Sequence, residues 1–147
     1  MLKPAVTELL HDILNSGSSL RVKATGRSMV PLLKGGEILT IKKVPHLSLR
    51  KGDLVFFKDN NGHPVIHRCI KKTISNDDII FQTKGDALLR PDKPIHHNQV
   101  LGKVLKMERV PLNSGSAPIN MESPGWIIMN YLIAAVNSIK SRIYCSF

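Results

Sequence analysis

The chain has few cysteines, few aromatic residues and no long apolar run, and each shortage excludes a class of protein. Two cysteines in 147 residues, Cys69 and Cys145, are too few for a disulfide framework. Only 5% of the residues are aromatic, so a stacking platform for single-stranded nucleic acid is not indicated. No stretch reaches the roughly 18 apolar residues of a membrane-spanning helix. The length suits one domain with a modest core.

Acidic residues are also scarce, with 11 Asp and Glu against 21 Lys and Arg, for a net charge of +10. Such a surplus favours anionic surroundings. No helix-turn-helix pattern or zinc-finger spacing accompanies the charge, so we expect no nucleic-acid partner. Anionic lipid head groups, or simply a soluble basic surface, are the two explanations that the composition leaves open.

The N-terminal residues do not form a secretory signal, because Glu8, His11 and Asp12 interrupt any apolar core of a signal peptide. Residues 4–16 instead repeat apolar side chains at helical spacing and stop before Gly17, which predicts an amphipathic helix in an N-terminal segment 1–18. With neither a secretory signal nor a spanning helix at this end, we expect a cytoplasmic or membrane-associated protein.

Short β runs separated by turn residues fill the region 19–110, which we interpret as the principal domain. Asn61-Gly62 marks a hairpin turn between two of these runs. The pattern predicts a mainly β fold, a small antiparallel or coiled barrel. The expected strands are Leu20–Thr25, Glu37–Lys43, Asp53–Lys58, Val65–Lys72, Asp78–Thr83 and Val100–Val110.

The last part of the chain divides into a linker and an apolar segment. Residues 111–124 have the composition of a linker. Residues 125–147 predict a C-terminal helix, apolar from Trp126 to Val136. That apolar part measures roughly 16 Å at 1.5 Å per residue, too short to span a bilayer. Residues 125–143 therefore either lie in the membrane interface as a peripheral contact or pack on the barrel or a partner subunit.

A serine in a constrained bend is the first candidate for chemistry. Ser28 lies between Gly26 and Pro31, at the end of a predicted strand, where the backbone can present a hydroxyl group. A serine is a weak nucleophile without a base in hydrogen-bond reach. His67 is the candidate base, since histidine ordinarily titrates near neutral pH, and acidic residues follow at Asp86 and Asp92.

Four motifs together resemble the ordered boxes of type I signal peptidases. They are Gly26–Pro31, Arg50–Val55, Val65–Arg68, and Lys84–Asp86 with Asp92. More narrowly, they are similar to the endoplasmic-reticulum and archaeal branch, in which a histidine stands in place of the bacterial lysine base. The resemblance covers about residues 20 to 110. This sequence would be a short form, without the N-terminal membrane helix of ordinary members.

The resemblance implies a mostly β fold and a serine endopeptidase that uses a Ser28–His67–Asp92 triad. Asp92 matches the position of the catalytic acid in the histidine branch, six residues after Asp86. We interpret Asp86 as structural and keep it as the alternative acid. No cofactor and no metal ion are implied.

The resemblance also places the oxyanion-binding and substrate-binding residues around the serine, at Gly26, Ser28, Met29 and Pro31. The Ser28 backbone N–H is the expected oxyanion donor. Many bacterial members carry a hydroxyl donor two positions before the nucleophile, and Gly26 lacks it. Substrates of the family bind as an added strand, which the resemblance places at Ala24–Gly26 and at the strand 37–43.

A metal site is a less favoured interpretation of the histidines. His63, His67 and Cys69 would share one face of a strand, but their spacing matches no known metal motif. His96 and His97 are expected to be exposed loop residues. The favoured function is therefore an endopeptidase that cleaves a leader or signal peptide from a precursor protein. The alternative is a non-catalytic peptide-binding or membrane-surface-binding protein of the same fold.

Overall fold

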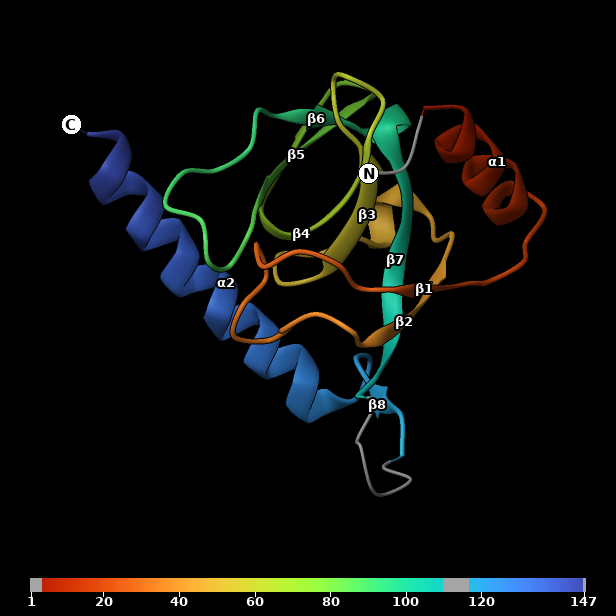
Figure 1. The fold of residues 1–147 in the computed structure, drawn as a ribbon. Helices are drawn as coiled ribbons and strands as arrows, with labels where there is room; N and C mark the ends of the chain where they lie inside the picture. The colour runs from red at the N-terminus through yellow and green to blue at the C-terminus, as the bar shows by residue number, and fades with distance from the viewer. Residues whose placement is uncertain (1–3, 110–116, 147) are drawn as a thin grey trace.

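The computed structural model describes residues 4–109 and 117–146, which form a curled antiparallel sheet flanked by two helices (Figure 1). Sheet order is β1-β2-β7-β3-β4-β5-β6, and β8 pairs with β7. The strands are β1 (Leu20–Lys23), β2 (Ile38–Lys42), β3 (Leu54–Lys58), β4 (Pro64–Ser75), β5 (Asp78–Lys84), β6 (Ile95–His96), β7 (Val100–Glu108) and β8 (Ile119–Asn120). The fold is mainly β, as the sequence predicted.

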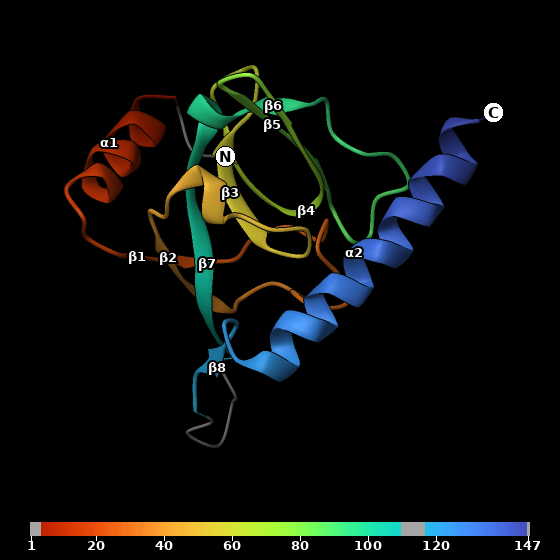
Figure 2. The same cartoon turned by 180° about the vertical axis from the view of Figure 1, so that it is seen from behind.

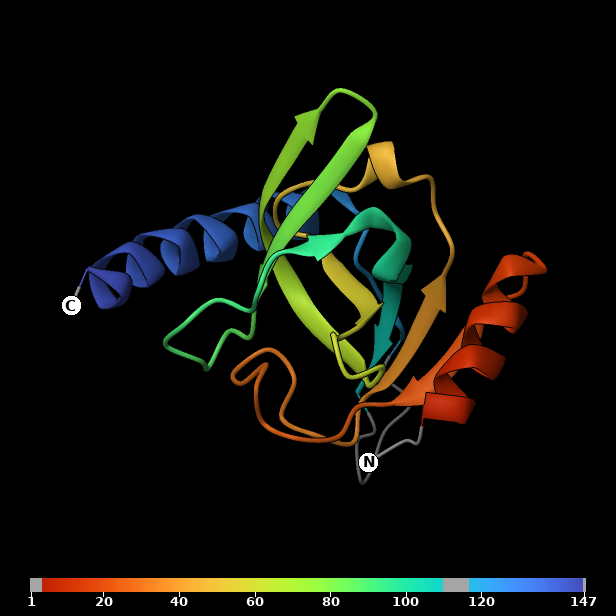
Figure 3. The same ribbon diagram turned by 90° about the horizontal axis from the view of Figure 1, so that it is seen from above.

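Curvature of the sheet comes from irregular pairing at three places. The register shifts between Thr40 and Ile41, between Phe56 and Phe57, and between Cys69 and Lys71. Bulges of this kind bend a strand and increase its twist. The result is a half-barrel, visible in Figure 3 as strands that wrap around a common interior.

Two apolar clusters fill the half-barrel. The first joins β2, β3 and β7 to the segment that follows Ser28, and it includes Met29, Leu39 and Met107. The second lies among β3, β5 and β6 and includes Phe57 and Phe81. Because strand β3 contributes alternate residues to the two clusters, it is buried on both faces along most of its length.

The helices lie at opposite sides of the sheet (Figure 2). Helix α1 (Pro4–Asn15) packs against β1 and β7 through Leu10 and Leu14. Leu9, by contrast, is 58% exposed. Helix α2 (Pro124–Cys145) packs against β4. Within residues 4–109 and 117–146, neither helix is long and apolar enough to cross a bilayer.

Each of the six predicted strands is present, with shifted bounds. The largest shift is in β4, which begins at Pro64 and runs on to Ser75. The two-residue strands β6 and β8 and the short 3₁₀ helices η1 (His46–Ser48) and η2 (His97–Gln99) were not predicted. Strand β8 falls in the segment predicted as a linker, of which residues 111–116 lie outside the described part of the chain.

Candidate functional site

Ser28 lies in a loop that connects β1 to β2 and is closed at its base by backbone hydrogen bonds. Ala24 N–H donates to Glu37 O over 2.7 Å, and Gly36 N–H donates to Ala24 O over 2.9 Å. Within the loop Gly26 adopts a φ of +81°, a value that favours glycine. The buried Met29 side chain anchors the residue after Ser28 in the first apolar cluster. These contacts hold Ser28 half-buried, with its hydroxyl group available to neighbours.

A continuous chain of hydrogen bonds joins Ser28, His67 and Asp92, which we call the Ser28–His67–Asp92 trio. The Ser28 Oγ atom lies 3.1 Å from His67 Nε2. On the other side of the ring, His67 Nδ1 lies 2.7 Å from Asp92 Oδ2. His67 is 7% exposed and projects from β4, whereas Ser28 and Asp92 come from loops. The structure therefore brings together all three residues that the resemblance indicated.

The hydrogen bonds around Asp92 determine which nitrogen of His67 carries the proton. An ionised carboxylate only accepts hydrogen bonds, so His67 Nδ1–H is the donor to Asp92. Thr83 Oγ1–H donates to the same Asp92 oxygen over 2.7 Å, and Gln82 Nε2–H donates to the Asp92 carbonyl. His67 Nε2 is then left with its lone pair directed at the Ser28 hydroxyl group. This is the arrangement that a general base requires.

Asp86, the alternative acid, bonds elsewhere. Its two carboxylate oxygens accept from Arg68 Nε and Nη2 over 2.8 and 2.7 Å. Asn137 Nδ2 donates to Asp86 Oδ1 over 2.7 Å. Arg68 is fully buried and the Asp86 side chain is 3% exposed, so the pair is a desolvated, bidentate ion pair. Asp86 thus stabilises the residue next to His67 but does not contact His67 itself.

The motif Lys84-Gly85-Asp86 and the residue that follows it also lie against the backbone carbonyl group of Ser28. Ala87 N–H donates to the Ser28 carbonyl over 2.9 Å. A Cβ atom on Gly85 would lie 2.7 Å from the same carbonyl oxygen, closer than any stable contact. Only glycine permits this approach of the two backbones. Lys84 is fully buried, and burial lowers the pKa of its ammonium group.

An apolar cavity of about 410 Å³ opens beside Ser28 and His67. Its walls come from the Ser28 loop, from β1, from the first half of β4 and from Leu10 of α1. A second cavity of about 410 Å³ is lined by His67 and Asp92 together with residues such as Asp59, Asn60 and Lys93. The trio therefore borders both cavities, since His67 lines each of them.

The residues expected to bind the oxyanion and the substrate are only partly at this cavity. Gly26, Ser28 and Met29 line it. Pro31 is exposed and lies outside the lining, although Leu33 of the same loop is part of it. Among the described residues, the Ser28 backbone N–H is left without a hydrogen-bond acceptor. The expected role of this N–H as the oxyanion donor stays a prediction.

One part of the predicted substrate edge is wrong. Strand β2, in the range 37–43, pairs with β1 on one side and β7 on the other, so its backbone groups are already used. Among the strands of the described residues, the free edges at the cavity belong to β1 and to Pro64–His67 of β4, a segment that pairs with β3 alone. An extended peptide that enters the cavity would lie between these two strands.

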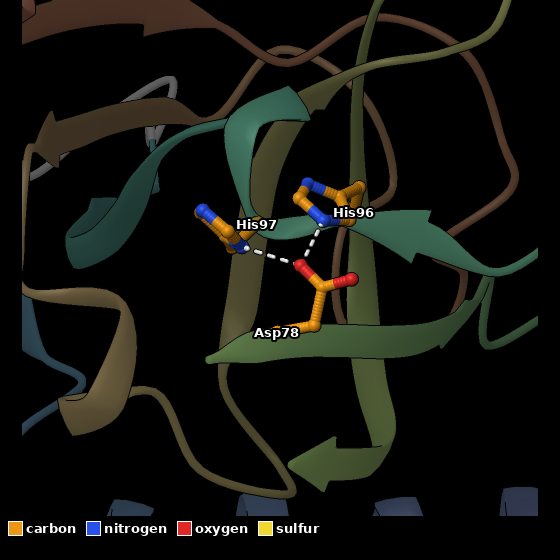
Figure 4. A group of neighbouring side chains, drawn as sticks. All are labelled: Asp78, His96 and His97. Carbon is orange, nitrogen blue, oxygen red and sulfur yellow. Dashed lines mark hydrogen bonds and ion pairs between the residues drawn. The ribbon is translucent and has the colours of Figure 1, made fainter. Parts of the chain in front are cut away.

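Two histidines outside the trio, His96 and His97, lie beside Asp78 (Figure 4). His96 Nε2 hydrogen bonds to Asp78, and His97 Nδ1 lies 3.9 Å from the same carboxylate. His96 Nδ1 accepts from Asn98 N–H over 3.4 Å, so Nε2 carries the proton and donates to Asp78. Asp78, His96 and His97 each offer one possible metal-ligand atom, and these atoms lie within 4.8 Å of one another. The expectation of exposed loop histidines was wrong, since His96 ends β6 and both rings are half-buried.

Sequence reasoning did not find several residues that shape the site. Thr83 and Gln82 position Asp92, and Leu10 and Leu88 line the cavity. Thr83 directly precedes the Lys84–Asp86 motif, so its position was visible but its hydroxyl contact was not. The contribution of Leu10 had no signal in the sequence, because it depends on how α1 docks on the sheet.

Comparison with known proteins gives a match to a signal peptidase I. Over 71 residues the chain is 32% identical to Signal peptidase I W of Bacillus subtilis (strain 168). The aligned region covers 48% of this chain and 37% of that relative, so the match spans little more than a third of the relative's length. No protein-family model matches the sequence. Over about half its length, the chain is thus similar to a signal peptidase I.

Proposed function

We propose that the protein is a serine endopeptidase of the signal-peptidase type that removes a leader or signal peptide from a precursor protein. The observation that carries the proposal is the hydrogen-bonded Ser28–His67–Asp92 trio at the mouth of an apolar cavity. The similarity to Signal peptidase I W supports the class of reaction. In this proposal His67 takes the role of the base, as in the histidine branch of the family.

The proposed reaction proceeds by acyl transfer. Ser28 Oγ attacks the carbonyl carbon of the scissile peptide bond while His67 Nε2 accepts the hydroxyl proton. The Ser28 backbone N–H donates to the oxyanion of the tetrahedral intermediate. His67 then protonates the leaving amine, and an ester with Ser28 remains. Water, deprotonated by His67, attacks this ester, releases the new carboxyl terminus and restores the serine.

Asp92 has a positioning role in this scheme. It holds His67 with Nδ1 protonated and stabilises the imidazolium that forms after proton transfer. The substrate is proposed to lie extended between β1 and the start of β4, with small or apolar side chains before the scissile bond in the cavity lined by Ala24, Met29 and Ile66.

The test compares protein N-termini by mass spectrometry in source cells that contain either the wild-type protein or Ser28→Ala. We expect a new N-terminus, produced after a small residue, to disappear in Ser28→Ala. Ser48→Ala, a serine on η1 away from the trio, is the matched control and should leave that N-terminus unchanged. Identical N-termini in wild type and Ser28→Ala, with both proteins folded, would refute the proposal.

The alternative function, peptide binding without cleavage, predicts a different pattern. A synthetic peptide that covers the precursor's cleavage region would bind wild type and Ser28→Ala equally, and neither protein would cleave it. The peptidase proposal instead predicts that Ser28→Ala binds the peptide and only the wild type cleaves it. Asp92→Asn is expected to lower kcat by about 10⁴-fold, because the amide favours the wrong tautomer of His67.

A further inference from the structure

Helix α2 is amphipathic in the reverse sense, with its polar side turned to the protein. The four residues that it buries are Asn130, Ala134, Asn137 and Ser141. Its exposed residues include eight large apolar or aromatic side chains, each at least 47% exposed: Ile128, Met129, Tyr131, Leu132, Val136, Ile139, Ile143 and Tyr144. A helix on the surface of a globular protein normally buries its apolar side. This arrangement therefore needs a separate explanation.

The polar side of α2 is tied to the buried charges next to the trio. Asn130 Oδ1 accepts from Arg68 Nη1 over 2.9 Å. Asn137 donates to Asp86 over 2.7 Å and accepts from Lys84 Nζ over 3.1 Å. These bonds satisfy buried polar groups that would otherwise be costly, so the helix cannot turn its apolar side inward without breaking them.

Close backbone packing fixes the same orientation. A Cβ atom on Gly52 would lie 2.8 Å from the Tyr131 backbone nitrogen. Glycine at this position thus lets α2 approach the turn before β3 more closely than any other residue would. In Figures 1 and 3 the helix runs along the outside of the half-barrel with one long side facing away from it. The outward orientation of the apolar residues is therefore built into the fold.

The exposed apolar residues form a continuous stripe, which we call the α2 stripe: Ile128, Leu132, Val136, Ile139 and Ile143. Their spacing of three or four residues places them on one side of the helix. At about 100° per residue, Lys140 and Arg142 fall on opposite borders of this stripe, each about 80° from its centre. Both basic residues are exposed.

No acidic residue occurs between Pro124 and Cys145. Tyr131 and Tyr144, which are partly exposed, lie toward the two sides of the stripe. Lys51 adds a further positive charge, with its Nζ atom 5.6 Å from the centre of the Tyr131 ring. An apolar stripe with basic borders, aromatic flanks and no acid is the pattern of helices that lie in the plane of an anionic membrane surface.

We propose that α2 is a lipid-binding helix that lies in the membrane plane and attaches the protein to an anionic bilayer surface. The α2 stripe enters the boundary between head groups and acyl chains, and Lys140 and Arg142 contact lipid phosphates. A second copy of the chain fits this side less well, because its α2 offers no carboxylate to pair with those two cations. The proposal is independent of the peptidase function, since it uses none of the trio.

The test measures co-sedimentation of the whole protein with vesicles of phosphatidylcholine mixed with phosphatidylglycerol, and of phosphatidylcholine alone. We expect binding to the anionic vesicles, weakened by salt. Leu132→Glu/Ile139→Glu, at the centre of the stripe, should weaken binding at least about tenfold, because two apolar side chains are replaced by charges that the lipids repel. Lys140→Gln and Arg142→Gln should each weaken it by about fivefold.

The matched control is Leu47→Glu/Ile74→Glu, which places the same two charges at apolar residues off α2 that are 66% and 57% exposed. It should bind vesicles nearly as wild type does. Equal vesicle binding by wild type and Leu132→Glu/Ile139→Glu would overturn the proposal. A second result would also overturn it: a wild-type protein that is a dimer in analytical ultracentrifugation and does not bind vesicles, together with a Leu132→Glu/Ile139→Glu variant that is a monomer. Ser28→Ala should bind vesicles as wild type does. Vesicle binding and peptide cleavage therefore test the membrane proposal and the peptidase proposal separately.

Discussion

The ion pair of Arg68 with Asp86 gives the sharpest prediction about stability. Arg68→Met removes the guanidinium group but keeps an apolar side chain of similar length in a fully buried position. The Asp86 carboxylate, 3% exposed, would keep Asn137 as its side-chain donor and lose both bonds from arginine. The Gly52 carbonyl, which accepts from Arg68 Nη1 over 3.0 Å, would also lose a donor.

Breaking one side of a buried ion pair costs about 3–5 kcal/mol, because the remaining charge stays buried without compensation. For a domain of this size, about 2–4 °C of Tm is lost for each kcal/mol, so Tm should fall by roughly 6–20 °C. Urea unfolding followed by circular dichroism measures the free energy. Arg21→Met is the control, because its ion pair with Glu108 is largely exposed on the arginine side, and it should cost about 1 kcal/mol or less.

The double variant Arg68→Met/Asp86→Leu distinguishes two contributions to the free energy of unfolding. One is the cost of leaving the Asp86 carboxylate buried without its partner, and the other is the net stabilisation by the intact ion pair. Since a buried pair can often be replaced by apolar groups at little cost, we expect the double variant to recover most of the stability lost by Arg68→Met. Two results would contradict this account. One is an Arg68→Met cost no larger than that of Arg21→Met, and the other is a double variant as unstable as the single one.

Three further predictions follow from the same region of the molecule. Gly85→Ala should lower peptidase activity and cost about 1–3 kcal/mol of unfolding free energy, because its Cβ would lie 2.7 Å from the Ser28 carbonyl oxygen; urea unfolding and peptide cleavage measure both. Burial lowers the pKa of Lys84, so the folded protein releases that proton at lower pH than the unfolded chain does. The unfolding free energy should then rise from the lowered pKa up to about pH 10.4, and Lys84→Met should lack this rise in urea titrations at increasing pH. Burial raises the pKa of the Cys69 thiol to about 12, so iodoacetamide at pH 8 should modify the exposed Cys145 and spare Cys69 until the protein unfolds.

The strands were predictable where the sequence alternates apolar and polar residues, or stays apolar, over enough residues to form a recognisable pattern. The return strand of the hairpin at Asn61-Gly62 is an example, although β4 extends beyond the predicted Lys72 to Ser75. The two-residue strands β6 and β8 were not predictable, because so short a segment has no pattern of its own. Each forms only because it pairs with a longer strand. Ile95 of β6 lies opposite Phe81 of β5, and Ile119 of β8 lies opposite Met107 of β7.

The candidate site was predictable in its residue types and less so in its partners. Consecutive residues of a strand point to opposite faces, so His67 and Arg68 cannot share one acid. Arg68 pairs with Asp86 on the side that faces α2, and His67 pairs with Asp92. This alternation supports the choice of Asp92 over Asp86 as the acid in the proposed mechanism. The pairing of Thr83 with Asp92 depends on the path of the loop after β5, which the sequence does not reveal.

Helix α2 illustrates why apolarity alone did not determine its environment. The segment was expected either in a membrane interface or on the barrel, and the structure places it on the barrel through Asn130 and Asn137 while its apolar side stays exposed. The two asparagines are seven residues apart, two turns of one helix side, and they meet charges contributed by β4 and the turn after β5. Those charges in turn flank the residues that hold Ser28 and His67. The contacts that orient α2 and the contacts that support the candidate site therefore belong to one network, and damage to either asparagine should disturb both.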